Sequence, residues 1–242
     1  MRICLISYEY PPDTHLGGIG TWTSNMSVAL KRKGHEVHVV AGTTEPDYDR
    51  HQDGIPVHRV KRPAVPLRES RHLAGAWRVA KRIAALELDF DIIHASEYRG
   101  EAFWLTWKRR WPVVTRLATP YRMVAELQEA SWLERRPTLD WIEKTQTLRS
   151  DGVFSSTNAL ADQVSKRWGL ARENVGVIPN SVDTSRVISM GNARPGKVIE
   201  GDYLIYFGRI EKRKGVDVLA KALPAVMSKH SRLKAVFVGK DM

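Results

Sequence analysis

Three glycines lie close together near the N-terminus, between an apolar run and a segment of helical character. The apolar run is Ile3–Ile6, and Gly17, Gly18 and Gly20 come directly before the expected helix. Glycines at this place let the backbone approach a ligand, and the N–H groups and dipole of a helix N-terminus attract an anion. Diphosphate is the natural candidate, although a tight turn without a ligand would use the same residues. The spacing lacks the third glycine of the dinucleotide fingerprint.

A second candidate site follows another apolar run, near the C-terminal end of the sequence. Gly208 and Gly215 permit sharp turns there, while Arg209 offers a fork of donors and Lys214 a point charge. Guanidinium and ammonium groups in such a loop can bind phosphate oxygens. The pattern predicts a phosphate clamp. The alternative without a ligand is a basic loop exposed to solvent.

Strand-length apolar runs alternate with segments of helical period along most of the chain. The runs are Ile3–Ile6, Val37–Ala41, Val57–Val60, Asp91–His94, Val113–Leu117, Val153–Ser155 and Val175–Ile178. The helical segments are Trp22–Lys33, Arg71–Leu88, Glu101–Arg110, Thr138–Arg149 and Ala159–Trp168. This alternation predicts an α/β fold, a Rossmann-like parallel sheet with helices on both faces. Ligands of such sheets bind at the carboxyl ends of the strands, so we expect chemistry in the loops after Ser7, His94, Leu117 and Ser155.

The sequence predicts three parts. Residues 1–180 form an N-terminal Rossmann-like domain, 181–201 a linker with Gly and Pro and no sustained period, and 202–242 the start of a second Rossmann-like domain. The second domain is expected to contain a strand at Tyr203–Phe207, a helix at Val216–Lys229 and a strand at Ala235–Val238. A domain of ordinary size needs roughly 100 further residues. We therefore expect this domain to be incomplete and the 242-residue chain to be inactive alone.

The composition limits the partners and the cellular compartment. The 38 Lys and Arg against 27 Asp and Glu give a formal net charge of +11, which predicts attraction to anions such as nucleotide phosphates, anionic lipid or nucleic acid. The single Cys4 excludes a disulfide within the chain and suits a reducing cytoplasm. No apolar segment has the length of a signal peptide core or a membrane span, so a cytoplasmic location is expected.

The chain resembles glycosyltransferase family 4 along nearly its whole length. The matching landmarks, in order, are Gly17–Gly20, Lys33–Val37, Asp91–Ala95, Val177–Asp183 and Phe207–Arg209 followed by Lys214–Gly215. The resemblance implies a fold of two Rossmann-like domains (GT-B), with the acceptor served by the first domain and the donor by the second. It also implies transfer of a hexosyl or related sugar from a nucleoside diphosphate with retained anomeric configuration, without a metal or other cofactor.

The resemblance also implies roles for particular residues. Gly17, Gly18 and Gly20 would face the donor diphosphate, and Arg209 and Lys214 would bind it from the second domain and offset the charge of the leaving group. Two departures stand out. Many members have a histidine where this chain has Ala118, within Leu117–Pro120, which implies altered donor choice or lost activity. The family's glutamate pair lies past Met242, so the catalytic residues stay unassigned.

Other polar residues next to these loops are candidates for acceptor contact. Asp13 and His15 flank the glycine loop and would either order it or touch the acceptor. Glu97, Tyr98 and Arg99 follow a predicted strand on the cleft side. His94, which ends that strand, is expected to be a structural hydrogen-bonding residue rather than a ligand. No Cys and His cluster has metal-ligand spacing.

One predicted helix, over Arg71–Leu88, has a cationic side. That side carries Arg71, Arg78 and Arg82, while Leu73, Trp77 and Ala80 are expected to pack on the sheet. A second basic cluster, Lys108–Arg110, precedes Trp111. Such a surface predicts peripheral contact with an anionic membrane that holds a lipid-linked acceptor. A merely basic face is the alternative.

The favoured function is transfer of a sugar from a nucleotide-sugar donor to a sugar, lipid-linked or small-molecule acceptor. A non-catalytic relative stays open because of Ala118. Another sugar-nucleotide enzyme, such as an epimerase or a phosphorylase-like protein, is a second alternative. A nucleic-acid-binding protein is the least supported, because no nucleic-acid module with interleaved aromatic residues is present.

Overall fold

The computed structural model describes residues 1–14, 17–64, 70–129, 136–191 and 199–239. Contacts divide the chain into two compact units. The first comprises Met1–Met123 and Ser131–Val182, and the second comprises Val124–Ala130 and Asp183–Met242. The main division, after Val182, falls inside the stretch 181–201 that the sequence predicts as a linker.

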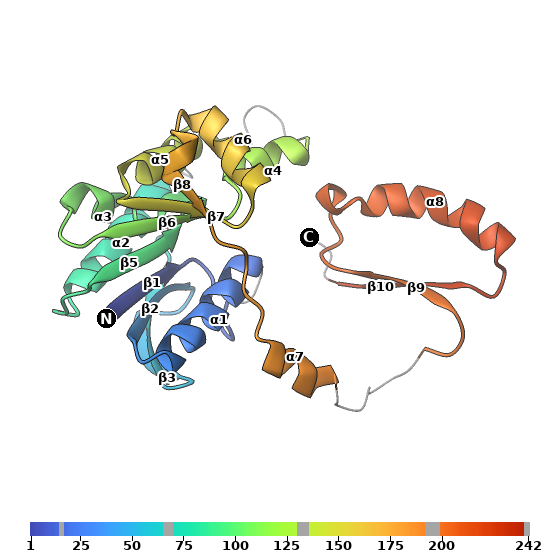
Figure 1. The fold of residues 1–242 in the computed structure, drawn as a ribbon, viewed down its shortest axis with the longest axis horizontal. Coiled ribbons are helices and arrows are strands. Elements are labelled where there is room, and N and C mark those ends of the chain that lie inside the picture. The colour runs from blue at the N-terminus through green and yellow to red at the C-terminus, as the bar shows by residue number, and fades with distance from the viewer. Residues whose placement is uncertain (15–16, 65–69, 130–135, 192–198, 240–242) are drawn as a thin grey trace. The chain divides into compact units, whose positions relative to one another are not determined.

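Within its described residues, the first unit contains an eight-stranded sheet (Figure 1). The strand order is β3-β4-β2-β1-β5-β6-β7-β8, and every pair is parallel except β3 with β4. The strands are β1 (Arg2–Ser7), β2 (Glu36–Thr43), β3 (Tyr48–Gln52), β4 (Ile55–Lys61), β5 (Ile92–Ser96), β6 (Val113–Leu117), β7 (Gly152–Ser155) and β8 (Val175–Val177). The predicted Rossmann-like sheet is thereby confirmed.

Strand β3 was not predicted, because its sequence is polar and lacks an apolar run. It pairs antiparallel with β4 through a two-residue turn, in which Asp53 has φ 53° and Gly54 has φ 69°. An Asp-Gly pair suits this left-handed turn and is a strong hairpin signal. The dipeptide was therefore the feature from which this strand could have been found.

Helices cover the first unit's sheet and bury its apolar side chains. They are α1 (Gly18–Arg32), α2 (Ser70–Ala84), α3 (Phe103–Lys108), α5 (Pro137–Arg149) and α6 (Asn158–Trp168), with short 3-10 turns η1 (Tyr98–Gly100) and η3 (Arg172–Asn174). A further helix, α4 (Tyr121–Leu127), crosses the division between the units after Met123. Successive strand residues point to opposite faces. Accordingly Ile3 and Leu5 join the cluster that packs with α1, whereas Cys4 and Ile6 join the cluster that packs with α2. Two cores therefore sandwich β1.

The second unit contains a parallel pair of strands, β9 (Tyr203–Phe207) and β10 (Lys234–Val238), which form a sheet of their own. Between them come η4 (Lys212–Lys214) and α8 (Val216–Lys229). A further helix, α7 (Thr184–Gly191), lies in the stretch where the sequence shows no sustained period. Eight residues make only about two turns, too few for a periodic apolar pattern to be recognised.

None of the helices in the described part of the chain combines the length and the hydropathy that a bilayer-spanning segment requires.

Candidate functional site

The glycine loop leads directly into α1, at the carboxyl edge of the first unit's sheet. Gly17 is the N-cap of this helix and has an extended backbone with no side chain to cap the first turn. A Cβ built on Gly20 would lie 2.9 Å from the backbone oxygen of Glu9. The absence of a side chain at Gly20 therefore lets α1 pack closely against the segment that follows β1. A Cβ on Gly18 would meet no atom within 4 Å in the part of the chain that the structure describes, apart from its chain neighbours and the backbone of its own helix. Gly20 therefore serves packing, while Gly18 leaves open space at the helix start.

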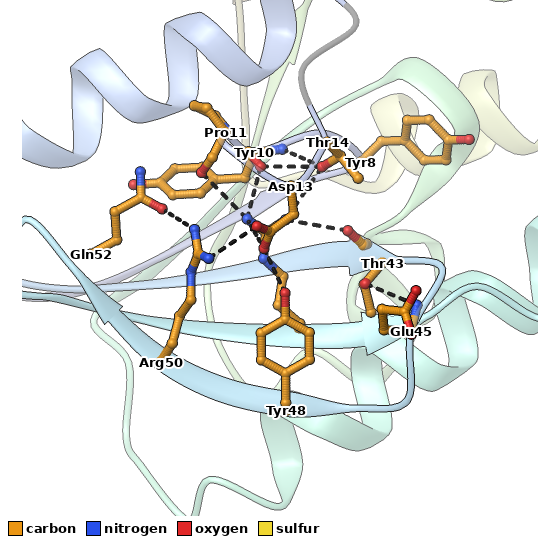
Figure 2. A network of polar contacts seen from close by, with 12 residues as sticks. Tyr8, Tyr10, Pro11, Asp13, Thr14, Thr43, Glu45, Tyr48, Arg50 and Gln52 are labelled. Atoms are coloured by element: carbon orange, nitrogen blue, oxygen red, sulfur yellow. Dashed lines mark hydrogen bonds and ion pairs between the residues drawn. The ribbon is translucent and has the colours of Figure 1, made fainter.

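Asp13 belongs to a polar network that ties the segment after β1 to the β3–β4 hairpin (Figure 2). Its carboxylate accepts hydrogen bonds from the Tyr48 hydroxyl and from Arg50 Nη1, the latter at 3.0 Å. Arg59 Nη2 lies 3.1 Å from the other carboxylate oxygen of Asp13. These contacts order the segment around Asp13, and its contact with an acceptor stays a prediction. His15 lies outside the described residues.

Arg59 is the buried centre of this network, and its side chain has no exposed surface. Its guanidinium donates to the backbone oxygen of Tyr10 at 2.8 Å and to Thr14 Oγ1 at 3.3 Å. Burial lowers the pKa of Arg59, and the charge of Asp13 acts in the opposite direction. A buried cation paired in this way fixes the path of the chain from β1 toward the glycine loop.

Two buried carboxylates hold the loops that follow β5 and β6. Glu97 accepts hydrogen bonds from the backbone N–H groups of Ala118, at 2.7 and 2.9 Å, and of Thr119, at 2.7 Å. Glu143, on α5, accepts from the N–H groups of Arg99 at 2.8 Å and of Tyr121 at 2.9 Å. Burial raises the pKa of both carboxyl groups, against the effect of the N–H donors. Glu97 was proposed as an acceptor contact, but its full burial favours a positioning role.

Tyr98 and Arg99 lie in η1 and are half-buried. The Arg99 backbone is left-handed, with φ 66°, and its guanidinium carbon lies 3.8 Å from the centroid of the Tyr8 ring. The Tyr98 and Tyr121 ring centroids are 6.5 Å apart. The structure therefore brings the loops after β1, β5 and β6 together, and only Arg99 and Tyr98 of the candidates from β5 keep access to a ligand.

His94 packs among aromatic rings. Its ring centroid lies 4.8 Å from that of Trp22 and 5.7 Å from that of Phe154. Within the described part of the chain neither ring nitrogen has a hydrogen-bond partner, so the expected hydrogen-bonding role is wrong while the structural role holds. Burial, with the nearby Arg116 charge, lowers the pKa of His94 to about 3. This ring is neutral at neutral pH.

Arg209 and Lys214 belong to the second unit, in the segment between β9 and α8. Gly208 and Gly215 adopt φ 154° and φ 71°, so both predicted turns need glycine-like backbone freedom. Arg209 Nη2 lies 3.4 Å from Glu211 Oε1, a partner that the sequence analysis did not foresee. Lys214 is exposed. These two cations lie on one short segment before the N-terminus of α8, and their binding of phosphate stays a prediction.

The basic surface differs from its prediction in two ways. Trp77 is 51% exposed, because the buried side of α2 consists of His72, Ala76, Val79, Ala80 and Ile83. Trp111 is buried in the core cluster that contains Phe90 and Val113. Three of the arginines form ion pairs, namely Arg78 with Asp47, Arg82 with Asp49 and Arg110 with Asp89. Asp49 of the unforeseen strand β3 and Asp47, just before it, thus offset part of the cationic stripe on α2. Membrane contact stays a prediction.

Comparisons with known proteins place the chain in one family. The model of "Glycosyltransferase Family 4" matches residues 16–186. An uncharacterised glycosyltransferase of Methanocaldococcus jannaschii is 23% identical over 256 residues, which cover 100% of this chain and 64% of that protein. Glycogen synthase of Mycobacterium tuberculosis is 25% identical over 286 residues, covering 99% and 62%. This chain therefore spans less than two thirds of the length of these relatives.

A solved structure shows the same fold. The catalytic domain of starch synthase IV from Arabidopsis thaliana, bound to ADP and acarbose, superposes with a TM-score of 0.66 at 15% identity, over 99% of this chain and 68% of that one. The sequence resemblance noted above is confirmed by the family match. The chain belongs to glycosyltransferase family 4.

Proposed function

We propose that the protein containing this chain is a glycosyltransferase that moves a sugar from a nucleoside diphosphate donor to an acceptor with retention of configuration. The observation that carries the donor proposal is the open position of Gly18 at the N-terminus of α1, where, among the described residues and apart from its chain neighbours and the helix's own backbone, a Cβ would meet no atom within 4 Å. Family membership supports the reaction class, and the starch synthase IV neighbour is bound to ADP. Retention rests on the family resemblance.

The first unit would contribute backbone N–H groups to the donor. Gly17 carries no side chain and the first turn of α1 contains no acidic residue, so a carboxylate at the positive end of the helix dipole comes from outside the helix, from Glu9, whose Oε2 would lie 3.2 Å from a Cβ on Gly17. A diphosphate oxygen could accept hydrogen bonds from that turn. The missing side chain of Gly18 would be the condition for this approach.

The second unit would contribute the charges. Departure of the nucleoside diphosphate leaves negative charge on the phosphate that held the sugar, and cations placed there stabilise the transition state. Arg209 and Lys214 would supply them, with Glu211 holding the Arg209 guanidinium at 3.4 Å. We propose that these cations fill the part that a divalent metal plays in other phosphate-leaving reactions, so that no metal or other cofactor is needed.

The first experiment changes Gly18 to Val in the full-length protein. The substitution adds a side chain at a position where a Cβ meets none of the described atoms outside its own helix backbone and chain neighbours, so we expect the melting temperature to change little and sugar transfer to fall by roughly 100-fold or more. Differential scanning calorimetry and turnover on the nucleotide sugar are measured on the same preparation. Retained turnover in a stable variant would overturn the donor role of this loop.

The second experiment tests the cations by calorimetric titration with ADP and UDP. Arg209→Ala and Lys214→Ala should each weaken binding by roughly 10- to 150-fold, because each removes a charge-assisted contact. Lys229→Ala, at the far end of α8, removes an equal charge from an exposed site and should change nothing. Unchanged affinity in both test variants removes these residues from the site. The anomeric configuration of the product, read by NMR, tests retention separately.

A further inference from the structure

Large aromatic rings are exposed on three neighbouring helices of the first unit. Helix α3 packs against both α2 and α5 (Figure 1). Each of the three helices carries one tryptophan that is 50 or 51% exposed, namely Trp77 on α2, Trp107 on α3 and Trp141 on α5. Leu148, further along α5, is exposed as well. Single exposed apolar residues are ordinary, but a group of them on adjacent helices marks an interaction surface.

Side-chain contacts join these rings into one surface. The ring centroid of the buried Phe103 lies 6.2 Å from that of Trp107 and 5.5 Å from that of Trp141. Trp104 lies 5.2 Å from the same Phe103 ring, and its indole N–H donates to the backbone oxygen of Leu73 at 2.9 Å. The exposed tryptophan of α2 is one turn further along that helix than Leu73. We call this continuous patch on α2, α3 and α5 the tryptophan surface.

Cations lie against the tryptophan surface. Lys81 Nζ is 5.4 Å from the centroid of the exposed ring of α2, and the guanidinium carbon of Arg149 is 3.8 Å from the centroid of Trp107. Lys108 and Arg109 follow directly in the chain and are exposed. A cation over one face of an aromatic ring is held there by the ring's quadrupole. The surface therefore combines exposed rings with positive charges held beside them.

Carboxylates are scarce on the same three helices. They contain two acidic residues, Asp140 and Glu143, both on α5. Glu143 is buried and accepts hydrogen bonds from backbone N–H groups. Asp140 accepts a hydrogen bond from Trp168 Nε1 at 3.2 Å and lies 3.5 Å from Arg122 Nη1. Both carboxylates are thus engaged within the protein, so these helices do not neutralise the cations of the tryptophan surface.

The cationic end of the tryptophan surface lies away from the proposed donor loop. Helices α3 and α5 end at Lys108 and Arg149, shortly before β6 and β7 begin at Val113 and Gly152. These helix ends are therefore near the amino edge of the sheet. The glycine loop follows the carboxyl end of β1, at the opposite edge. A partner on the tryptophan surface would leave the glycine loop open.

We propose that the tryptophan surface docks on an anionic membrane. Indole rings are favoured at the membrane–water interface, and lysine and arginine add attraction to anionic headgroups. Three half-exposed rings on three helices can each sink among lipid headgroups, whereas a folded protein partner would need a matching pocket for every ring. The sequence analysis expected membrane contact through Arg78 and Arg82, which instead pair with acidic residues. The inference goes beyond sugar transfer and does not depend on the donor proposal.

The test is co-sedimentation of the full-length protein with vesicles of phosphatidylcholine, alone or mixed in equal parts with phosphatidylglycerol. We expect binding to the anionic vesicles and roughly tenfold weaker binding to the neutral ones. Trp107→Ala and Trp141→Ala should each weaken binding to anionic vesicles by roughly tenfold, and Lys81→Gln by about fivefold. Lys33→Gln is the matched control, because this exposed residue follows α1, which packs on the other face of the sheet from α2.

Thermal unfolding followed by circular dichroism verifies that each variant is folded. Lys81 is exposed, so its variant tests the proposal even if a tryptophan variant is destabilised. Anionic-vesicle binding that falls in Trp107→Ala and Lys81→Gln but not in Lys33→Gln supports the proposal. Absence of vesicle binding, equal binding to both kinds of vesicle, or equal weakening by Lys33→Gln overturns it.

Two other occupants of the tryptophan surface have their own readouts. Binding of soluble polyglutamate without binding of vesicles would assign the surface to an acidic protein. Self-association that is lost in Trp107→Ala, measured by analytical ultracentrifugation without vesicle binding, would assign it to a second copy of the protein. Either result overturns membrane docking. Vesicle binding is measured without nucleotide and ADP binding without vesicles, so the failure of one proposal leaves the other standing.

Discussion

The two units share one local arrangement and differ in how much of it is buried. In each, a strand leads through a glycine-bearing loop into a helix, from β1 to α1 and from β9 to α8. In β1 every residue after the half-buried Arg2 is buried, whereas Phe207 at the end of β9 is 82% exposed and α8 buries no residue. Strand, turn and helix therefore follow from local sequence, while a core needs packed layers on both faces of the sheet.

The largest effect is expected from a core substitution in the first unit. Ile93 is fully buried, so Ile93→Ala should lower the free energy of unfolding by about 2–5 kcal/mol. Urea unfolding followed by tryptophan fluorescence reports on this unit, because no tryptophan follows Trp168. Phe207→Ala should leave that transition unchanged within about 0.5 kcal/mol. A comparable loss in both variants would show that the contrast between the units is false.

The next effect concerns two neighbouring glycines of α1. Gly20→Ala should destabilise the first unit by about 1–3 kcal/mol, because its Cβ would press on the Glu9 backbone at 2.9 Å. Gly18→Ala should lie within about 0.5 kcal/mol of the wild type or above it, since alanine favours a helix. The same urea titration measures both. Equal destabilisation would remove the distinction between a packing glycine and a ligand-facing one.

A smaller effect, seen only in acid, should come from His94. Its pKa is lowered from 6.5 to about 3, so between these values the unfolded chain binds more protons than the folded one, and stability falls as the pH falls. The loss amounts to roughly 1–2 kcal/mol by pH 5. His94→Phe should flatten this part of the profile, which unfolding at a series of pH values records. If the free energy of unfolding of His94→Phe changes with pH as it does in the wild type, another group is responsible for the acid destabilisation.

The smallest effect on folding is expected from a substitution in the proposed donor-binding site. Lys214 is exposed, and Lys214→Ala should change the thermal midpoint of the first unit by less than a degree or so, within the usual range of surface substitutions. Its effect on ADP affinity, tested above, should be large. A thermal shift as large as that of Gly20→Ala would link this side chain to folding and contradict the separation between the two units.

The alternation of apolar runs predicted most of the fold because burial on both faces of a parallel sheet leaves continuous apolar strands. It could not find β3, whose residues Tyr48–Gln52 are polar and half-exposed, and it placed Trp77 inward when that ring is 51% exposed. The helical period of a sequence indicates how wide the apolar face of a helix is. It does not indicate which neighbouring elements cover each part of that face.

The candidate site was predictable only where local motifs define it. Gly18 and Lys214 stand in recognisable loops, but Glu143 does not, because its partner Arg99 is 44 residues away in sequence. Arg62 gave no signal either, because its stacking on the Tyr8 ring joins segments that are distant in the sequence. Long-range partners depend on strand order, which periodicity does not encode.

The bonds made by Glu97 and Glu143 bear on how this scaffold can be diversified. Both carboxylates accept hydrogen bonds from main-chain N–H groups, those of Ala118, Thr119, Arg99 and Tyr121. None of these hydrogen bonds involves the side chain of the donor residue. The identity of residue 118 can therefore change while the course of its loop is kept. A library randomised at this position should yield folded proteins whose preferences differ, which makes it a practical starting point for altering substrate choice without rebuilding the frame.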